Sequence, residues 1–273
     1  MIWVYQLPNW LLASAIMGGF TVLSLAGLAF TRPWIRRPRG EDSTIIVGFV
    51  SAVGVLYAVL LAMIAVATWN NYTQVDALVS QEANAVHAIF RDVEGYPPAA
   101  RERLRTLLRE YVKLVVHTEW PALQQGILEK RAGLVVDSIF HEILTHRPDT
   151  DGEKTVTSEV LERLNTFQIL RRNRIQLGVS GVEPVLWLVV LFGGVMNLGL
   201  TYLFWMEDYR LQQVLTGGLG LTIGLVIFVI VALDHPLWGE VSVSPAAFDA
   251  VADSMDRLMD PMTPAQRRFS NRP

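Results

Sequence analysis

The ionisable side chains best placed to do chemistry occur as two pairs with helical spacing. Asp137 and His141 are four residues apart, and so are Glu142 and His146. Residues at this spacing lie on one face of a helix, where a carboxylate and an imidazole can share a metal ion. Solvated or hydrogen-bonded pairs of this kind are commoner than metal sites. We therefore expect no bound metal.

The sequence lacks the motifs of the common catalytic chemistries. It has no phosphate-binding G-x-x-x-x-G-K-[ST], no zinc-binding H-E-x-x-H and no G-x-S-x-G nucleophile motif. It also has no Cys, which excludes a disulfide scaffold and a Cys-ligated metal. We expect a protein without enzymatic activity and without a cofactor.

The charged residues are unevenly distributed along the chain. Residues 70–184 hold 14 of the 23 Lys and Arg and 16 of the 26 Asp and Glu, whereas long stretches elsewhere carry no charge. The net charge of −3 leaves no basic excess to neutralise phosphates, which excludes an electrostatic nucleic-acid binder. The uneven distribution also excludes a simple soluble enzyme.

Four uncharged stretches are each long enough to cross a membrane. A helix rises 1.5 Å per residue, so roughly 20 residues cross a hydrocarbon core of about 30 Å. Trp side chains collect at the ends of these stretches, as they do at membrane–water interfaces. The four predicted transmembrane helices are Trp10–Phe30, Thr44–Trp69, Val185–Met206 and Gln212–Leu233.

The segment between spans two and three is predicted to be a soluble helical domain. Its apolar residues recur at i, i+3 and i+4, the period of an amphipathic helix, and no strand pattern appears. The fold class is therefore an all-α, polytopic membrane protein with a helical soluble insert. The predicted parts are spans one and two in 1–69, the soluble domain in 70–184, spans three and four in 185–235, and a tail in 236–273. The clearest helical runs contain Leu104, Leu108, Tyr111 and Val112, then Ala132, Val135, Val136 and Ile139, then Val160, Leu164 and Phe167.

The second span carries a face of mostly small residues. Neither Pro nor Gly follows Trp69 until Gly95, so this helix is predicted to continue to about Val93. Small residues on a membrane helix mark close packing against another helix of the same chain. The alternative is a face that surrounds the central axis of an oligomer. The face consists of Gly48, Ser51, Val55, Ala58, Ala62 and Ala65, and we call it the small-residue seam.

A passive pore is the transport chemistry that the spans allow. No ionisable residue lies inside a span, which argues against an ion-coupled transporter. Hydroxyl groups and apolar constrictions suffice for a pore. Within the seam, Val55 is the bulkiest residue and the candidate constriction, and Ser51 offers a hydroxyl to a partly dehydrated ion. Asp234 and His235 end the fourth span, where they either mark the interface or form a candidate ion-access point or gate.

Arginines predict how the chain is oriented in the membrane. Short Arg-rich loops stay in the cytoplasm. The loop after the first span is of this kind and would place residues 70–184 outside the cytoplasm. Arg171, Arg172 and Arg174, which lie near span three, favour the reverse orientation. The loop contains Arg32, Arg36, Arg37 and Arg39, and no Lys or Arg precedes it.

Glycines inside the spans predict close helix packing. Gly220 and Gly224 are four residues apart, a spacing that lets two membrane helices approach closely. The pairs Gly193-Gly194 and Gly18-Gly19 suit the same role.

Three short segments carry a resemblance to a known family. They are Gln81–Val86, the stretch Tyr111–Pro121 with its Glu119-Trp120-Pro121, and Asp234–Pro245. They resemble the bacterial bestrophin-like membrane family over about residues 10–250, with Leu237 in place of the usual aromatic residue. The family has no established catalytic residues. Its remote relatives, the true bestrophins, are pentameric anion channels with four spans per subunit and a large helical cytosolic part.

The leading hypothesis is a homo-oligomeric ion channel or pore whose second span lines the axis. The resemblance implies five subunits, and it implies a cytosolic insert where the Arg-rich loop predicts an external one. The expected partners are the lipid bilayer, inorganic ions and further copies of the chain, and the expected location is a bacterial inner membrane. The alternative is a membrane-anchored scaffold or sensor whose helical domain binds a partner or ligand.

Overall fold

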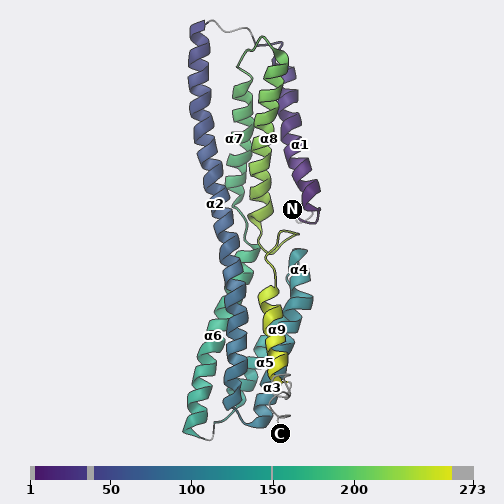
Figure 1. The fold of residues 1–273 in the computed structure, drawn as a ribbon. Helices are drawn as coiled ribbons and strands as arrows, with labels where there is room; N and C mark the ends of the chain where they lie inside the picture. The colour runs from purple at the N-terminus through teal and green to yellow at the C-terminus, as the bar shows by residue number, and fades with distance from the viewer. Residues whose placement is uncertain (1–3, 36–39, 149, 260–273) are drawn as a thin grey trace, which may run out of the picture. The chain divides into compact units, whose positions relative to one another are not determined.

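The computed structural model describes residues 4–35, 40–148 and 150–259, with the backbone alone for residues 40–43. Within these ranges every regular element is helical (Figure 1). This confirms the predicted all-α class. The α-helices are α1 (Asn9–Thr31), α2 (Gly40–Asp92), α3 (Pro98–Leu114), α4 (Trp120–Gln124), α5 (Arg131–Thr145), α6 (Asp151–Val179), α7 (Pro184–Thr201), α8 (Tyr209–Asp234) and α9 (Ala246–Met259). The 3₁₀ turn η2 (Val93–Gly95) connects α2 to α3, and the π-helical turn η3 (Val115–Glu119) connects α3 to α4.

The chain divides into two compact units. Unit 1 contains Met1–Tyr72 and Ser180–Val241, and unit 2 contains Thr73–Val179 and Ser242–Pro273. Helix α2 contributes residues to both units and continues to Asp92, as the absence of Pro and Gly predicted. Four helices of the described chain are long and apolar enough to cross a membrane, which agrees with the four predicted spans.

In unit 1, α1 and α8 lie side by side (Figure 1) and approach closely at two glycines. A Cβ atom added at Gly220 would lie 2.8 Å from the carbonyl oxygen of Phe20, and one at Gly224 would lie 2.9 Å from Cα of Met17. The predicted packing role of this glycine pair is therefore confirmed. By contrast, added Cβ atoms at Gly18 and Gly19 would have no described atom within 4 Å, so these two glycines do not serve packing within the described chain.

Helix α7 is shorter than the predicted third span, because it ends at Thr201 rather than Met206. The chain turns after Thr201, and the turn is held by polar contacts from the start of α8. The Gln212 side chain donates to the carbonyl oxygen of Phe204 at 2.6 Å. Asp208 caps α8 by accepting from the backbone N–H of Arg210 at 2.9 Å. The absence of charged residues in the predicted span Val185–Met206 did not indicate this turn.

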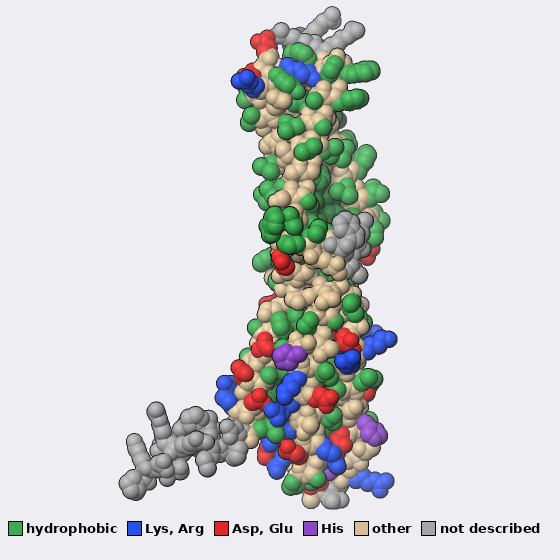
Figure 2. Space-filling model, turned by 90° about the vertical axis from the view of Figure 1, so that its right-hand side faces the viewer, with side chains coloured by type: hydrophobic (Ala, Val, Ile, Leu, Met, Phe, Trp, Pro, Cys, Tyr) green, Lys and Arg blue, Asp and Glu red, His purple; other side chains and the backbone are tan. Residues whose placement is uncertain are grey.

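In unit 2 the amphipathic helices bury the predicted apolar residues. Leu104, Leu108, Ile139, Leu164 and Phe167 are all fully buried, which confirms the helical periods. Part of the predicted tail, Ala246–Met259, forms α9, and its residues Phe248, Val251 and Met255 are buried. The view in Figure 2 shows a mostly hydrophobic surface over unit 1 and many charged side chains over unit 2.

Candidate functional site

Most of the small-residue seam borders a depression of about 500 Å³ between α2, α7 and α8, next to the buried face of α2. This buried face carries Tyr57, Leu61 and Ile64. Of the seam residues, Gly48, Ser51, Val55, Ala58 and Ala62 are exposed in the protomer, and Ala65 is half-buried against the core. Val55 keeps 62% of its surface exposed. The exposed seam residues are therefore free to contact something outside the protomer.

Tyr57 determines which face of α2 points outward. Its hydroxyl donates to the carbonyl oxygen of Val190 on α7 at 2.9 Å. Its ring lies against two glycines of α7, because a Cβ added at Gly193 would come within 2.8 Å of the ring and one at Gly194 within 2.8 Å of the hydroxyl oxygen. These contacts fix the rotation of α2 about its axis. Gly193-Gly194 thus has the packing role that its sequence predicted.

Asp234 and His235 form a polar junction at the end of α8. Buried Asp234 accepts from the Tyr5 hydroxyl at 3.1 Å and from the backbone N–H of Val182 at 2.5 Å. His235 stacks on Trp238 with ring centroids 3.9 Å apart, and its Nδ1 lies 3.2 Å from the Asp234 carboxylate. Burial, helped by the nearby Asp234 carboxylate, raises the pKa of Tyr5. This arrangement ties three chain segments of unit 1 together.

The two carboxylate–histidine pairs do not converge on a common point. Asp137 and His141 are exposed on α5, Glu142 accepts from Arg103 at 2.7 Å, and His146 packs against the ring of Tyr96. Within the described residues no group of three or more His, Asp or Glu could hold a metal ion.

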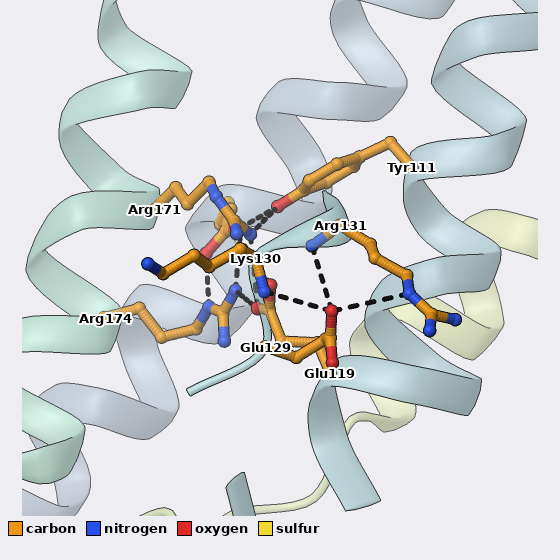
Figure 3. Close-up of polar contacts among 8 residues, drawn as sticks. Tyr111, Glu119, Glu129, Lys130, Arg131, Arg171 and Arg174 are labelled. Atoms are coloured by element: carbon orange, nitrogen blue, oxygen red, sulfur yellow. Dashed lines mark hydrogen bonds and ion pairs between the residues drawn. The ribbon is translucent and has the colours of Figure 1, made fainter. Parts of the chain in front are cut away.

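Unit 2 contains a buried ion cluster that sequence reasoning missed. It consists of Glu82 on α2, Tyr111 on α3, Glu119 on η3, and Arg171 and Arg174 on α6. Figure 3 shows the two guanidinium groups of α6 directed toward the carboxylates and the phenol. These side chains come from four elements of the chain, and each is buried.

Each carboxylate of the cluster is engaged by arginine. Arg171 holds Glu119 through two N–H groups, at 2.6 and 3.2 Å. Arg174 holds Glu82 in the same forked way and also reaches Glu119 at 2.7 Å. The Tyr111 hydroxyl donates to Glu82 and accepts from Arg171 at 2.9 Å. Two negative and two positive groups balance, which is what allows them to be buried.

Burial alone would raise the pKa of Glu119, but Arg174 and Arg171 outweigh it and lower this pKa below its usual range. Burial also raises the pKa of Tyr111, and the Glu82 carboxylate acts in the same direction. Burial opposes the charge of both guanidinium groups, but the nearby carboxylates outweigh it and raise the pKa of Arg171 and Arg174. Glu119 therefore stays ionised and Tyr111 stays protonated near neutral pH, so the cluster is suited to structure rather than to proton transfer.

The π-helical turn η3 explains how Glu119 enters the cluster. A π-helical turn adds a residue to the helical ladder and changes the direction of the side chains that follow. Glu119 is the last residue of this turn, and the next residue, Trp120, is buried with its indole N–H donating to the carbonyl oxygen of Val243 at 2.9 Å. The Arg174 guanidinium lies 5.2 Å from the centre of the Trp120 ring. Glu119 and Trp120 of the motif are therefore part of the core of unit 2, whereas Pro121 is exposed.

The sequence profile of the Bestrophin-like domain matches residues 18–248. The chain belongs to the Bestrophin-like family. This confirms the resemblance drawn from the three short motifs. In this Bestrophin-like chain, the residues of those motifs lie in the ion cluster (Glu82 and Glu119) and at the junction after α8 (Asp234 and Trp238).

Solved structures show the same fold. Two variants of a bacterial bestrophin homologue from Klebsiella pneumoniae align with TM-scores of 0.64 and 0.60, at 12% and 13% identity. Each alignment covers 90% of this chain. The first covers 98% of the homologue and the second covers 96%. A variant described as a membrane protein aligns with a TM-score of 0.64 at 13% identity, covering 88% of this chain and 94% of that one. A search of curated proteins gave no match.

Proposed function

We propose that this Bestrophin-like protein is a homo-oligomeric ion channel or pore without enzymatic activity, in which α2 lines the central axis. The observation that carries the proposal is the exposed seam. Helix α2 exposes Ser51, Val55 and Ala62, while an adjacent face of the same helix is buried in the protomer. Family membership and the four membrane-spanning helices support the same function.

The chemistry of the seam suits passive conduction. A ring of Val55 side chains forms an apolar constriction that gates by dewetting, and a ring of Ser51 hydroxyls replaces part of an ion's hydration shell. We propose that Asp234 and His235 contribute to gating through the junction that they form with Tyr5, since this junction holds the end of α8.

Ion flux into liposomes containing the purified protein tests the proposal. Val55→Ala should widen the constriction and raise the flux, and Val55→Asp should change the ion preference. Val22→Ala, at an equally exposed valine of α1, is the matched control and should leave the flux unchanged. Unaltered flux in well-assembled Val55 variants would remove Val55 from the pore.

We further propose a bacterial inner membrane as the location, with unit 2 outside the cytoplasm. The support is the Arg-rich loop after the first span, of which Arg36, Arg37 and Arg39 lie outside the described residues. A reporter that is active only outside the cytoplasm should work when fused near Gly126. Activity of a cytoplasmic reporter at this site would reverse the orientation and favour the bestrophin arrangement.

A scaffold or sensor is the second candidate function, and one groove in unit 2 favours it. The groove has a volume of about 710 Å³ and lies between α5 and α6, where Leu134 and Ile169 are 65% and 60% exposed. A partner helix or an amphipathic ligand would cover these side chains. Absence of flux from the wild-type protein in every ionic condition would favour this function over the channel.

A further inference from the structure

The end of the first span carries an arginine that neighbouring side chains hold in place. Arg32 ends α1, where its backbone N–H donates to the carbonyl oxygen of Leu28. Its guanidinium carbon lies 4.0 Å from the centre of the Tyr209 ring and 5.3 Å from the centre of the Trp205 ring. Its Nη1 donates to Oε1 of Gln212 at 3.4 Å. The three groups that hold this side chain all come from the turn after α7 and the start of α8.

Gln212 is itself fixed, so it orients the guanidinium group. Its side chain is buried, and its amide nitrogen donates to the carbonyl oxygen of Phe204 at 2.6 Å while its amide oxygen accepts from Arg32. Contact with two aromatic rings further restricts the Arg32 side chain. Because the planar fork of N–H groups is already ordered, a ligand that binds to it loses less conformational entropy than it would on a free arginine.

This ordered cation has no anionic partner among the described residues. A guanidinium group has five N–H donors, and Arg32 uses one of them in the long bond to Gln212. The carboxylate of Asp208, next to Tyr209 in the sequence, instead caps α8 by accepting from the backbone N–H groups of Arg210 and Leu211. Arg32 is only partly buried. Its remaining N–H groups can therefore bind an anion from outside the protein.

The position of Arg32 indicates which anion this is. Helices α1 and α8 are both long and apolar enough to cross a membrane, and Arg32 lies where one ends and the other begins, the depth at which lipid headgroups lie. Trp34 is 81% exposed, as expected of an indole in the headgroup region. Leu215, one turn beyond Gln212 on the same side of α8, is 52% exposed and offers apolar surface to an acyl chain. A phospholipid uses all of these features, whereas inorganic phosphate would use only the guanidinium group.

We propose that Arg32, held by Tyr209, Trp205 and Gln212, binds the phosphate group of an anionic phospholipid. Two N–H groups of a guanidinium match two phosphate oxygens, which gives a strong charge-assisted contact. A zwitterionic lipid carries its own ammonium group and has no net negative charge, so the site should prefer phosphatidylglycerol to phosphatidylcholine. The site lies within one protomer and does not depend on the channel, on the number of subunits or on the direction of the chain in the membrane.

Native mass spectrometry of the full-length protein in mild detergent tests the site. The protein is titrated with phosphatidylglycerol or with phosphatidylcholine of the same acyl chains, and the bound lipids are counted. The wild-type protein should bind phosphatidylglycerol more tightly. Arg32→Gln should weaken this binding by about tenfold, as expected for the loss of a hydrogen bond to a charged group, and should leave phosphatidylcholine binding unchanged. Arg32→Lys keeps the charge but loses the planar fork, so its affinity should lie between the two.

Arg210→Gln is the matched control, because it removes the same charge from an exposed position beside Tyr209 in the sequence. It should bind phosphatidylglycerol as the wild-type protein does. An equal loss in the Arg210 and Arg32 variants would show general attraction by net charge and overturn the proposal, and so would unchanged binding in Arg32→Gln. If inorganic phosphate binds at Arg32 as tightly as the lipid does, the ligand is free phosphate and the assignment to a lipid is wrong.

Thermal unfolding separates lipid binding from a purely structural role of Arg32. A ligand that binds only the folded state raises the melting temperature, so phosphatidylglycerol should raise that of the wild-type protein and of Arg210→Gln. It should have little effect on Arg32→Gln. If Arg32 only holds the turn after α7, its variant should melt at lower temperature without lipid and still gain the full increment from phosphatidylglycerol, which would refute the proposal.

Discussion

Unit 1 and unit 2 hold their helices together in different ways. In unit 1, α1 and α8 meet through backbone contact at Gly220 and Gly224, and α7 meets α2 through glycines under the Tyr57 ring. In unit 2, amphipathic helices bury their apolar faces. Four charged side chains form ion pairs at the centre of this unit, next to one phenol.

The difference fits the surroundings that we propose for each unit, lipid for unit 1 and water for unit 2. Between membrane helices the hydrophobic effect gives no net attraction, because lipid tails are as apolar as leucine, so close backbone packing provides the stability. In water, burial of apolar faces drives association, and a charge is tolerated inside only when it is paired. Substitutions should therefore act by different mechanisms in the two units.

Arg174→Met should have the largest effect on stability. The variant leaves Glu82 without the arginine that binds it through two N–H groups, and it leaves Glu119 with only one arginine. Such unpaired buried charge costs about 3–5 kcal/mol. Unit 2 should then unfold at lower temperature and become sensitive to protease. Arg172→Met, at the exposed neighbouring position, is the control. Equal stability of the two variants would show that the cluster does not hold unit 2 together.

Gly220→Leu should disrupt unit 1 to a smaller degree. The new side chain would overlap the backbone of α1 at Phe20, and forced overpacking costs about 1–3 kcal/mol. Gly218→Leu is the matched control, because no described atom lies within 4 Å of a Cβ there. Thermal unfolding in detergent should distinguish the two. Similar melting temperatures would contradict close packing of α1 and α8.

Acid should weaken unit 2 before it weakens unit 1. Arg174 and Arg171 lower the pKa of Glu119, so the folded state binds this proton less readily than the unfolded state. The stabilisation is complete above the unfolded-state pKa of about 4.3 and is lost as the pH falls through the lower folded-state pKa. Circular dichroism or limited proteolysis between about pH 6 and pH 2 measures the loss. Glu119→Gln should flatten the pH dependence of stability. An unchanged pH dependence in the variant would assign the loss of stability to other titrating groups.

Tyr57→Phe should have the smallest effect. The variant keeps the ring against Gly193 and loses only the bond to the Val190 carbonyl oxygen, and single polar contacts between membrane helices average about 0.6 kcal/mol. The melting temperature should drop slightly while assembly persists. A large loss would mean that this hydrogen bond, rather than ring packing, sets the rotation of α2.

The amino-acid sequence by itself determined the spans and the helices, because both depend on local properties. A charge-free stretch of sufficient length partitions into a membrane whatever it contacts, and a 3.6-residue apolar period identifies the buried side of a helix such as α3. The spacing of Gly220 and Gly224 likewise indicated close packing before any partner helix was known. The three motifs identified the family.

Only the tertiary structure decided which side chains meet. Glu82 and Arg174 are 92 residues apart and form one ion pair, and nothing in their local sequence indicates the other. The seam on α2 was visible in the sequence, but its outward direction depends on the Tyr57 ring packing against Gly193 and Gly194 of α7, which lie far away in the sequence. The turn after Thr201 depends on Gln212 reaching back to Phe204. Such contacts have no local signature, because they depend on how the helices rotate and pack against one another.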